Sequence, residues 1–264
     1  MKVLFIGDVI GIPGYDLLKT FLPSIKSRYH IDFVVANAEN ITDGMGMLEK
    51  DALELLKLEI DVLTGGNHTM DKIQSHKFIN ENQQILRPLN YPKGAYGKGF
   101  GIFDLKSKGL KIAVVNLQGR VFMRTIDCPF RCFDSVIERI KAITNLVVVD
   151  FHAETTSEKV AFGWYADGRA SAVIGTHTHI QTSDERILPG GTAYITDVGM
   201  TGAYDSVIGM KKEQSIKRFV YATPQKHEVA KDDLHVSGAV FEIDNLTGKA
   251  KSIERLFFPA FNSD

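Results

Sequence analysis

The sequence predicts an α/β fold built on a parallel β-sheet. Two observations support this prediction: short continuous apolar runs alternate with longer segments of helical periodicity, and several of the apolar runs end directly in polar residues. Continuous apolar runs are typical of strands that are buried on both faces, as in a parallel sheet covered by helices. Because parallel strands end at one edge of their sheet, we expect the polar residues to converge in one crevice.

The first unit is a strand over Lys2–Ile6, followed by a helix over Gly14–Tyr29. Asp8 stands directly after the strand. The glycines of the intervening loop invite comparison with a dinucleotide-binding loop, but they are spaced G-x3-G-x2-G instead of G-x-G-x-x-G. An aspartate also occupies the place where a pyrophosphate would need room. The sequence therefore disfavours a nucleotide cofactor.

Two further units repeat this design in the first half of the chain. Glu39 and Asn40 follow the second apolar run, and Asn67 and His68 follow the third. Their positions beyond buried strands favour a functional role over a role as surface turn residues. The elements expected here are strands over Asp32–Asn37 and Ile60–Leu63 and helices over Glu49–Lys57 and Asp71–Asn80.

The second half places three histidines in the same way. His152 follows a strand over Leu146–Asp150, and His177 and His179 follow a strand over Ala172–Ile174. An H-x-H pair in an extended chain points its two rings to opposite sides. Both rings can therefore reach one site only if they serve two adjacent centres or if the loop curves. The other expected elements are a loop over Gly94–Gly101, helices over Asp134–Thr144, Thr156–Tyr165 and Gln214–Tyr221, and a strand over Lys111–Asn116. Three further strands are expected to be antiparallel: Tyr194–Ile195, Ala239–Ile243 and Ile253–Phe257.

Composition is that of an ordinary globular protein, with 44% hydrophobic and 24% charged residues among 264. The net charge of −1 provides no overall basic field for a long nucleic acid. No apolar run reaches the roughly eighteen residues of a membrane span, and the first residues do not form a signal peptide. We therefore expect a cytoplasmic protein with one domain over residues 1–264, and free thiols at Cys128 and Cys132.

Seven side chains at the strand ends form a mixed oxygen and nitrogen ligand set. They are two carboxylates, two carboxamides and three imidazoles: Asp8, Glu39, Asn40, Asn67, His152, His177 and His179. Such a set suits iron, manganese or zinc better than magnesium or calcium. Two divalent ions would leave the site positively charged, which attracts a phosphate. Two metals about 4 Å apart also lower the pKa of a bridging water and favour in-line displacement at phosphorus.

His68 adjoins the expected ligand Asn67 but need not bind metal itself. As an imidazolium it would protonate a leaving alkoxide or stabilise the developing negative charge. A Ser-His-Asp triad explains the sequence less well, because no G-x-S-x-G motif is present. Arg120 and Arg169 are candidates for contacting the substrate, although an ion-paired loop arginine is the favoured interpretation of Arg120.

Five blocks of the sequence, in this order, resemble the ligand blocks of the calcineurin-like metallophosphoesterases. They are Gly7-Asp8, Glu39-Asn40, Gly66-Asn67-His68, His152 and Gly175-Thr176-His177-Thr178-His179. Longer strings such as MKVLFIGDVIG, GGNHTMDK and DGRASAVIGTHTHIQT resemble the YmdB-like branch of that superfamily. The usual Asp-x-His opening is absent, and Glu39 replaces the usual bridging aspartate, but the YmdB-like branch shares both changes. The resemblance weakens after about residue 210.

The resemblance implies a four-layer αββα sandwich, in which two sheets pack face to face with helices outside. It also implies two divalent metal ions, iron or manganese with zinc as a further possibility, and it makes His68 the catalytic histidine. The implied ligands are Asp8, Glu39, Asn40 and His179 for one metal and Asn67, His152 and His177 for the other, with Glu39 bridging the two.

The activity implied by the resemblance is hydrolysis of phosphodiesters. A metal-bridging hydroxide would attack the phosphorus of 2′,3′-cyclic nucleotides to give 3′-monophosphates, while His68 assists the leaving group. The alternative is a metal-bearing regulatory protein that binds nucleotides or an RNA-processing partner, with weak or incidental hydrolysis. The two hypotheses make different predictions for His68, because only the enzyme requires this residue for its effect. The resemblance also favours a homo-oligomer.

Overall fold

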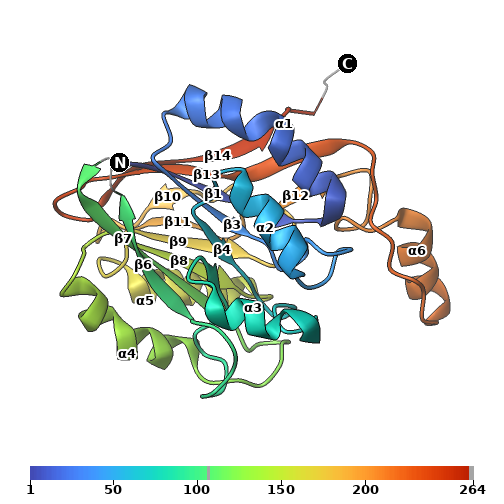
Figure 1. Cartoon of the computed structure of the whole chain (residues 1–264), viewed down its shortest axis with the longest axis horizontal. Coiled ribbons are helices and arrows are strands. Elements are labelled where there is room, and N and C mark those ends of the chain that lie inside the picture. The colour runs from blue at the N-terminus through green and yellow to red at the C-terminus, as the bar shows by residue number, and fades with distance from the viewer. Residues whose placement is uncertain (106–107, 262–264) are drawn as a thin grey trace.

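The computed structural model describes residues 1–105 and 108–261, which form two β-sheets packed face to face (Figure 1). Within these residues the first sheet has eight strands and the second has six. The strands of the first sheet are β1 (Lys2–Ile6), β2 (Asp8–Val9), β3 (Phe33–Asn37), β4 (Val62–Thr64), β5 (Ile85–Leu86), β12 (Met200–Ala203), β13 (Leu234–Ile243) and β14 (Ala250–Phe258). Those of the second sheet are β6 (Phe100–Leu105), β7 (Leu110–Gln118), β8 (Val147–His152), β9 (Ala172–Thr176), β10 (Arg186–Ile187) and β11 (Ala193–Ile195).

Most strands that carry the predicted polar residues are parallel to their neighbours. In the first sheet β1, β3, β4 and β5 run parallel. In the second sheet β7, β8, β9 and β11 run parallel, with β6 and β10 as antiparallel edge strands. Strand β13 lies antiparallel between β1 and β14, so the antiparallel prediction is confirmed for the last two strands. It is wrong in part for Tyr194–Ile195, because β11 runs parallel to β9 and is antiparallel only to β10.

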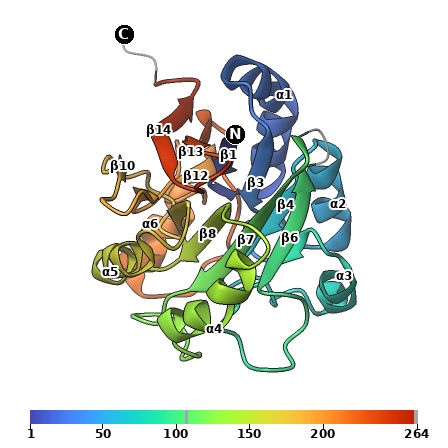
Figure 2. The ribbon, with the colours of Figure 1, turned by 90° about the vertical axis from the view of Figure 1, so that its left-hand side faces the viewer.

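Helices cover the outer face of each sheet, as Figure 2 shows for α1, α2 and α3 on one side and α4 and α5 on the other. Helix α6 projects from the body of the protein and has no buried residue (Figure 1). The helices are α1 (Gly11–Tyr29), α2 (Glu49–Lys57), α3 (His76–Glu81), α4 (Pro129–Lys141), α5 (Thr156–Ala166) and α6 (Lys212–Tyr221). None of the helices in the described ranges is long and apolar enough to cross a membrane.

Three apolar layers separate the four layers of secondary structure. Along β1, Leu4 and Ile6 pack toward the helices on the first sheet, whereas Val3 and Phe5 pack against the second sheet. This alternation is expected of a strand, because successive side chains point to opposite faces. The third layer lies between the second sheet and helices α4 and α5 and contains Phe162. The predicted αββα sandwich is therefore confirmed.

Two predictions about local structure are wrong in part. The expected loop over Gly94–Gly101 is a loop as far as Gly99, but its last two residues begin edge strand β6. Gly99 also serves close packing, since a Cβ there would lie 2.3 Å from Cα of Leu89. The helix expected over Asp71–Asn80 is a short 3-10 turn at Ile73–Ser75 followed by α3, because the side chain of Asp71 turns back to His68.

Other details agree with the sequence or extend it. Helix α1 begins at Gly11, three residues earlier than predicted, and Pro13 lies in its first turn, where a missing N–H removes no helical hydrogen bond. Cys128 and Cys132 are both free thiols, as predicted.

The layer beneath α4 and α5 contains a cluster of aromatic rings centred on Phe162. Its ring stacks on Phe151 at 4.3 Å between centroids and contacts Phe133 edge-on at 5.5 Å. We expect Phe162→Ala to lower the free energy of unfolding by about 3–5 kcal/mol, because it leaves a cavity in a fully buried position. Urea denaturation followed by circular dichroism measures this loss. The same substitution at Phe219, which is 81% exposed, should leave the midpoint nearly unchanged.

Candidate metal centre

The predicted site residues lie where the carboxyl ends of strands from both sheets meet. Asp8 belongs to β2, Glu39 and Asn40 follow β3, and Asn67 and His68 follow β4. His152 is the last residue of β8, and His177 and His179 follow β9. Their contacts divide these side chains into two neighbouring groups, with His68 beside them.

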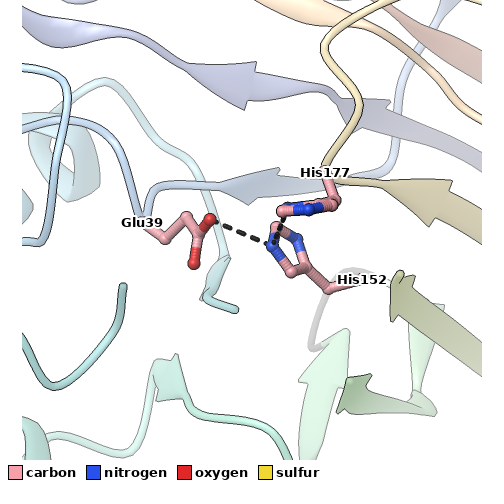
Figure 3. A group of neighbouring side chains, drawn as sticks. All are labelled: Glu39, His152 and His177. Atoms are coloured by element: carbon pink, nitrogen blue, oxygen red, sulfur yellow. Dashed lines mark hydrogen bonds and ion pairs between the residues drawn. The ribbon is translucent and has the colours of Figure 1, made fainter. Parts of the chain in front are cut away.

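The first group surrounds the Nε2 atom of His152. This nitrogen lies 3.0 Å from Oε1 of Glu39, from Oδ1 of Asn67 and from Nδ1 of His177. Figure 3 shows that Glu39 and the two histidines point toward one another from different strands. Their ligand atoms lie within 4.8 Å of one another, as atoms that share a metal ion do.

The second group is centred on Nε2 of His179. It lies 3.1 Å from the carboxamide nitrogen of Asn40 and 3.8 Å from Oδ1 of Asp8. The other oxygen of Asp8 accepts a hydrogen bond from the backbone N–H of His177. Because this bond joins Asp8 to His177 of the first group, the two groups are adjacent.

The residues fit divalent metal ions. Oδ1 of Asp8 is buried and accepts no hydrogen bond from any residue in the described parts of the chain. A buried carboxylate oxygen without a partner is costly, and a cation would satisfy it. Burial also raises the pKa of Asp8, while the neighbouring His179 and His152 oppose that shift. Carboxylate and carboxamide oxygens with imidazole nitrogens are the donors that iron, manganese and zinc accept.

The carboxylates around His152 favour a positive charge at the position of its ring. Burial alone would lower the pKa of His152, but Glu39, Asp8 and Asp150 raise it to about 9. Burial alone would likewise raise the pKa of Glu39, but His152 and His68 lower it to about 2. Glu39 is therefore a carboxylate at neutral pH, which is the form that binds metal.

The loop between His177 and His179 curves, which answers the question left open by the H-x-H pattern. Both histidines adopt left-handed backbone conformations, with φ of 100° and 67°. Non-glycine residues in this region are strained and are typical of functional sites. The curvature sends His177 to the first group and His179 to the second. Gly175 precedes the loop, and a Cβ there would lie 1.7 Å from the carbonyl oxygen of Thr196.

Two residues that the sequence analysis did not predict fix the orientation of His152. Nδ1 of His152 lies 2.9 Å from Oγ1 of Thr176, and this hydroxyl donates to Oδ1 of Asp150 at 2.7 Å. Because the hydroxyl proton is used toward Asp150, Nδ1 must carry the proton that binds Thr176. Nε2 is then free to bind metal, an arrangement that also orients histidine ligands in other metal sites. Asp150 ends one predicted strand and Thr176 follows another, and a lone threonine or aspartate at such a position gives no functional signal in the sequence.

A buried ion pair supports the curved loop from behind. Nζ of Lys159 lies 2.5 Å from Oδ2 of Asp197 and donates to the carbonyl oxygen of Thr176 at 2.7 Å. The same oxygen of Asp197 accepts the backbone N–H of Thr178, which lies between the two histidines. Both side chains of the pair are 1% exposed. The loop is therefore fixed by a charge pair that water cannot screen.

His68 lies beside the first group. Its backbone N–H donates to Oε2 of Glu39 at 2.8 Å, and its Nδ1 lies 2.6 Å from Oδ2 of Asp71. A carboxylate can only accept at this distance, so Nδ1 carries a proton and Nε2 remains available to a substrate. Asp71 is a further site residue that the sequence analysis placed at the start of a helix. Its spacing of three residues from His68 is the signal that could have revealed it.

The predicted arginine candidates have different surroundings. Arg169 forms an ion pair with Asp134 at 2.7 Å and lies over the ring of Tyr165. It therefore joins helices α4 and α5, and its interpretation as a substrate contact is wrong. Arg120 is exposed, directly after the end of β7.

Comparison with known proteins is decisive for the family. The chain matches the family of YmdB-like proteins over residues 4–256. The chain belongs to the YmdB-like family. It is 49% identical over 256 residues to the 2′,3′-cyclic-nucleotide 2′-phosphodiesterase of Bacillus subtilis strain 168, which covers 97% of this chain and 96% of that protein. The predicted resemblance is confirmed.

Solved structures agree with membership of the YmdB-like family. A novel phosphatase from Mycoplasma pneumoniae superposes with a TM-score of 0.91 at 38% identity, over 98% of this chain and 93% of that chain. The 5′-nucleotidase of Candida albicans, at 12% identity, superposes with a TM-score of 0.58 over 97% of this chain and 50% of that chain, and shows the shared fold alone. The predicted class, a metal-dependent enzyme that hydrolyses phosphoric esters, is confirmed.

Gly66 provides a test of the first ligand group. A Cβ at this position would lie 2.3 Å from the ring of His152 and 2.5 Å from Oε2 of Glu39. We expect Gly66→Ala to displace both side chains and to weaken manganese affinity by about tenfold or more. Metal titration with elemental analysis measures this change. Lys77→Ala is the control, because this side chain is 86% exposed on α3. Unchanged manganese affinity in Gly66→Ala would show that the first group does not bind metal.

The buried pair of Lys159 and Asp197 provides a test of the support beneath the loop. Asp197→Ala leaves the ammonium group of Lys159 buried without its counter-ion, so we expect a loss of about 3–5 kcal/mol in the free energy of unfolding. Urea denaturation measures it. Glu54→Ala removes a carboxylate from the exposed pair with Lys57 and should leave stability almost unchanged. Equal stability of the two variants would contradict a structural role for the buried pair.

Proposed function

We propose that the protein hydrolyses 2′,3′-cyclic nucleotides to 3′-monophosphates at a dinuclear metal centre. The observation that carries the proposal is the pair of adjacent ligand groups, joined by the hydrogen bond from His177 to Asp8 and flanked by His68. The activity named for the Bacillus subtilis relative, which is 49% identical along nearly its whole length, supports the choice of substrate.

Each ligand group has a proposed metal. Asp8, Asn40 and His179 would hold one ion, Asn67, His152 and His177 would hold the other, and Glu39 would contribute a carboxylate between the two groups. The mixed oxygen and nitrogen donors favour iron or manganese and also accept zinc. When bound, two such ions polarise the phosphate and lower the pKa of a water positioned between them.

His68 supplies the proton that the reaction requires. As a hydroxide ion, formed when water releases one proton to solvent, adds its oxygen to phosphorus, the bond between phosphorus and O2′ breaks, and Nε2 of His68 donates a proton to O2′. Asp71 accepts the hydrogen bond from Nδ1 and so stabilises the protonated imidazole before transfer. The bond from the backbone N–H of His68 to Glu39 fixes the position of this histidine relative to the ligand groups. The product is a nucleoside 3′-monophosphate.

Replacement of His68 tests this mechanism. We expect His68→Ala to lower kcat for 2′,3′-cyclic AMP by about a hundredfold or more, since the general acid is lost. Asp71→Asn should cause a smaller loss in the same direction. The measurement is turnover by manganese-loaded protein, with chromatographic identification of the monophosphate. His30→Asn, at an exposed position after α1, is the control and should retain full activity.

The same experiment distinguishes an enzyme from a metal-bearing regulatory protein. If the wild-type protein carries two metal ions but does not hydrolyse the cyclic nucleotide, the proposed activity is wrong. If it forms the 2′-monophosphate instead, the proposed direction of bond cleavage is wrong, because the proton would then be delivered to O3′.

A further inference from the structure

The loop that follows β7 lies next to the proposed catalytic residues and has no role in the mechanism described above. It runs from Gly119 to Asp127 and connects β7 to α4. Its first residue follows Gln118, which is paired with the metal-ligand candidate His152 in the sheet. In sheets of this kind, the loops after parallel strands bind the substrate.

Both ends of this loop are fixed by one buried side chain. The carboxamide of Asn90 accepts the backbone N–H of Gln118 at 3.0 Å and donates to the carbonyl oxygens of Gln118 and Asp127. The backbone carbonyl of Asn90 also accepts the N–H of Asp127. Asn90 is fully buried. The loop therefore leaves and re-enters the body of the protein at one rigid point.

The start of the loop is fixed in a second way. The carboxylate of Glu158 accepts the backbone N–H groups of Arg120 and Val121 at 3.1–3.2 Å. Gly119 permits this close approach, since a Cβ there would lie 2.6 Å from both Ala153 and Glu158. The positions of the side chains that follow are therefore set by the sheet and not by the loop alone.

The side chains held out by this loop are an aromatic ring between two cations. Phe122 is 89% exposed, the highest value among the exposed large hydrophobic residues of the described chain. It lies in a turn closed by the bond from the N–H of Met123 to the carbonyl of Arg120, with φ of 61°. This conformation favours glycine, so a phenylalanine here is strained. Arg120 and Arg124, two residues away on either side, are both exposed.

The loop also contacts Asp71, the hydrogen-bond partner of His68. A guanidinium nitrogen of Arg124 lies 3.8 Å from Oδ1 of Asp71, whose other oxygen binds His68. The phenol of Tyr91, the residue after Asn90, donates to the carbonyl oxygen of Gly66 at 2.9 Å, one residue before Asn67. The exposed ring thus lies two residues from a side chain that contacts the partner of the proton donor.

We infer that this loop binds the nucleobase of the substrate, with Phe122 as the residue on which the base stacks. The inference rests on the proposed function, because it assumes that the phosphate is held beside His68. Stacking of a base on an exposed aromatic ring is favourable and tolerates different bases, since every base has a π-face. Arg120 and Arg124 add positive charge to the same loop, which suits the anionic substrate. The loop would make the enzyme prefer phosphodiesters that carry a base.

The test compares substrates with and without a base. The substrates are 2′,3′-cyclic AMP and methyl ribofuranoside 2,3-cyclic phosphate, which has the same ribose and phosphate but no base. For Phe122→Ala we expect the KM for cyclic AMP, divided by the KM for the base-free compound, to rise by about tenfold. Phe122→Trp should restore the wild-type ratio. A ratio that does not change in Phe122→Ala would overturn the inference.

A binding measurement separates this inference from the proposed function. Calorimetry with the manganese-loaded protein compares adenosine 3′-monophosphate with ribose 3-phosphate. If wild-type protein hydrolyses neither cyclic compound, the proposed function fails. The base-binding loop would still be supported if Phe122→Ala bound adenosine 3′-monophosphate about tenfold more weakly while its affinity for ribose 3-phosphate stayed unchanged. Phe219→Ala is the matched control, because this ring is 81% exposed on α6. If Phe219→Ala weakens nucleotide binding and Phe122→Ala does not, the base binds beside α6 and the inference is wrong.

Discussion

The buried carboxylate of Asp150 joins the two sheets directly behind the metal centre. It accepts hydrogen bonds from Thr64 and Asn37 of the first sheet, at 2.5 and 3.1 Å, and from Thr176 of the second. Burial raises its pKa to about 7, although His152 and the hydroxyl donors oppose the shift. Because the ligands come from both sheets, the relative position of the sheets sets every distance between ligands. The hydrogen bonds of Asp150 are polar contacts in the interface that fixes the relative position of the two sheets.

The candidate metal centre also depends on backbone features that supply no candidate ligand. Gly66 and Gly175 leave no room for a side chain, and the left-handed conformations of His177 and His179 direct two neighbouring rings to different groups. The strain of this loop is offset by the pair of Lys159 and Asp197 beneath it. The ligands therefore depend on a support whose residues have no chemical role of their own.

Sequence alone predicted much of this structure because the signals were local. Apolar runs revealed the buried strands, and polar residues after them revealed the eight predicted site residues, whose side chains the fold brings together. Residues that act through other residues, such as Thr176 and Asp150, gave no signal, since a polar residue within a strand has many ordinary explanations. Strand β6 was missed because the glycines before and within it indicated a loop, whereas Gly99 packs against Leu89 and Gly101 against Phe103, which only the three-dimensional structure reveals. The arrangement of the sheets came from the family resemblance and not from periodicity.

The order of strands in the first sheet has a consequence for how the chain folds. Strand β13 lies between β12 and β1, so the amino-terminal strand pairs with residues 234–243. The ribosome releases that segment long after β1, and until then β1 has one free edge. Such pairing between distant parts of a chain slows folding. Asp8 pairs with Met200 of β12, and β12 in turn pairs with β13. The ligand group of Asp8 therefore assembles only after β12 and β13 have been made, although every other candidate ligand precedes these strands in the chain.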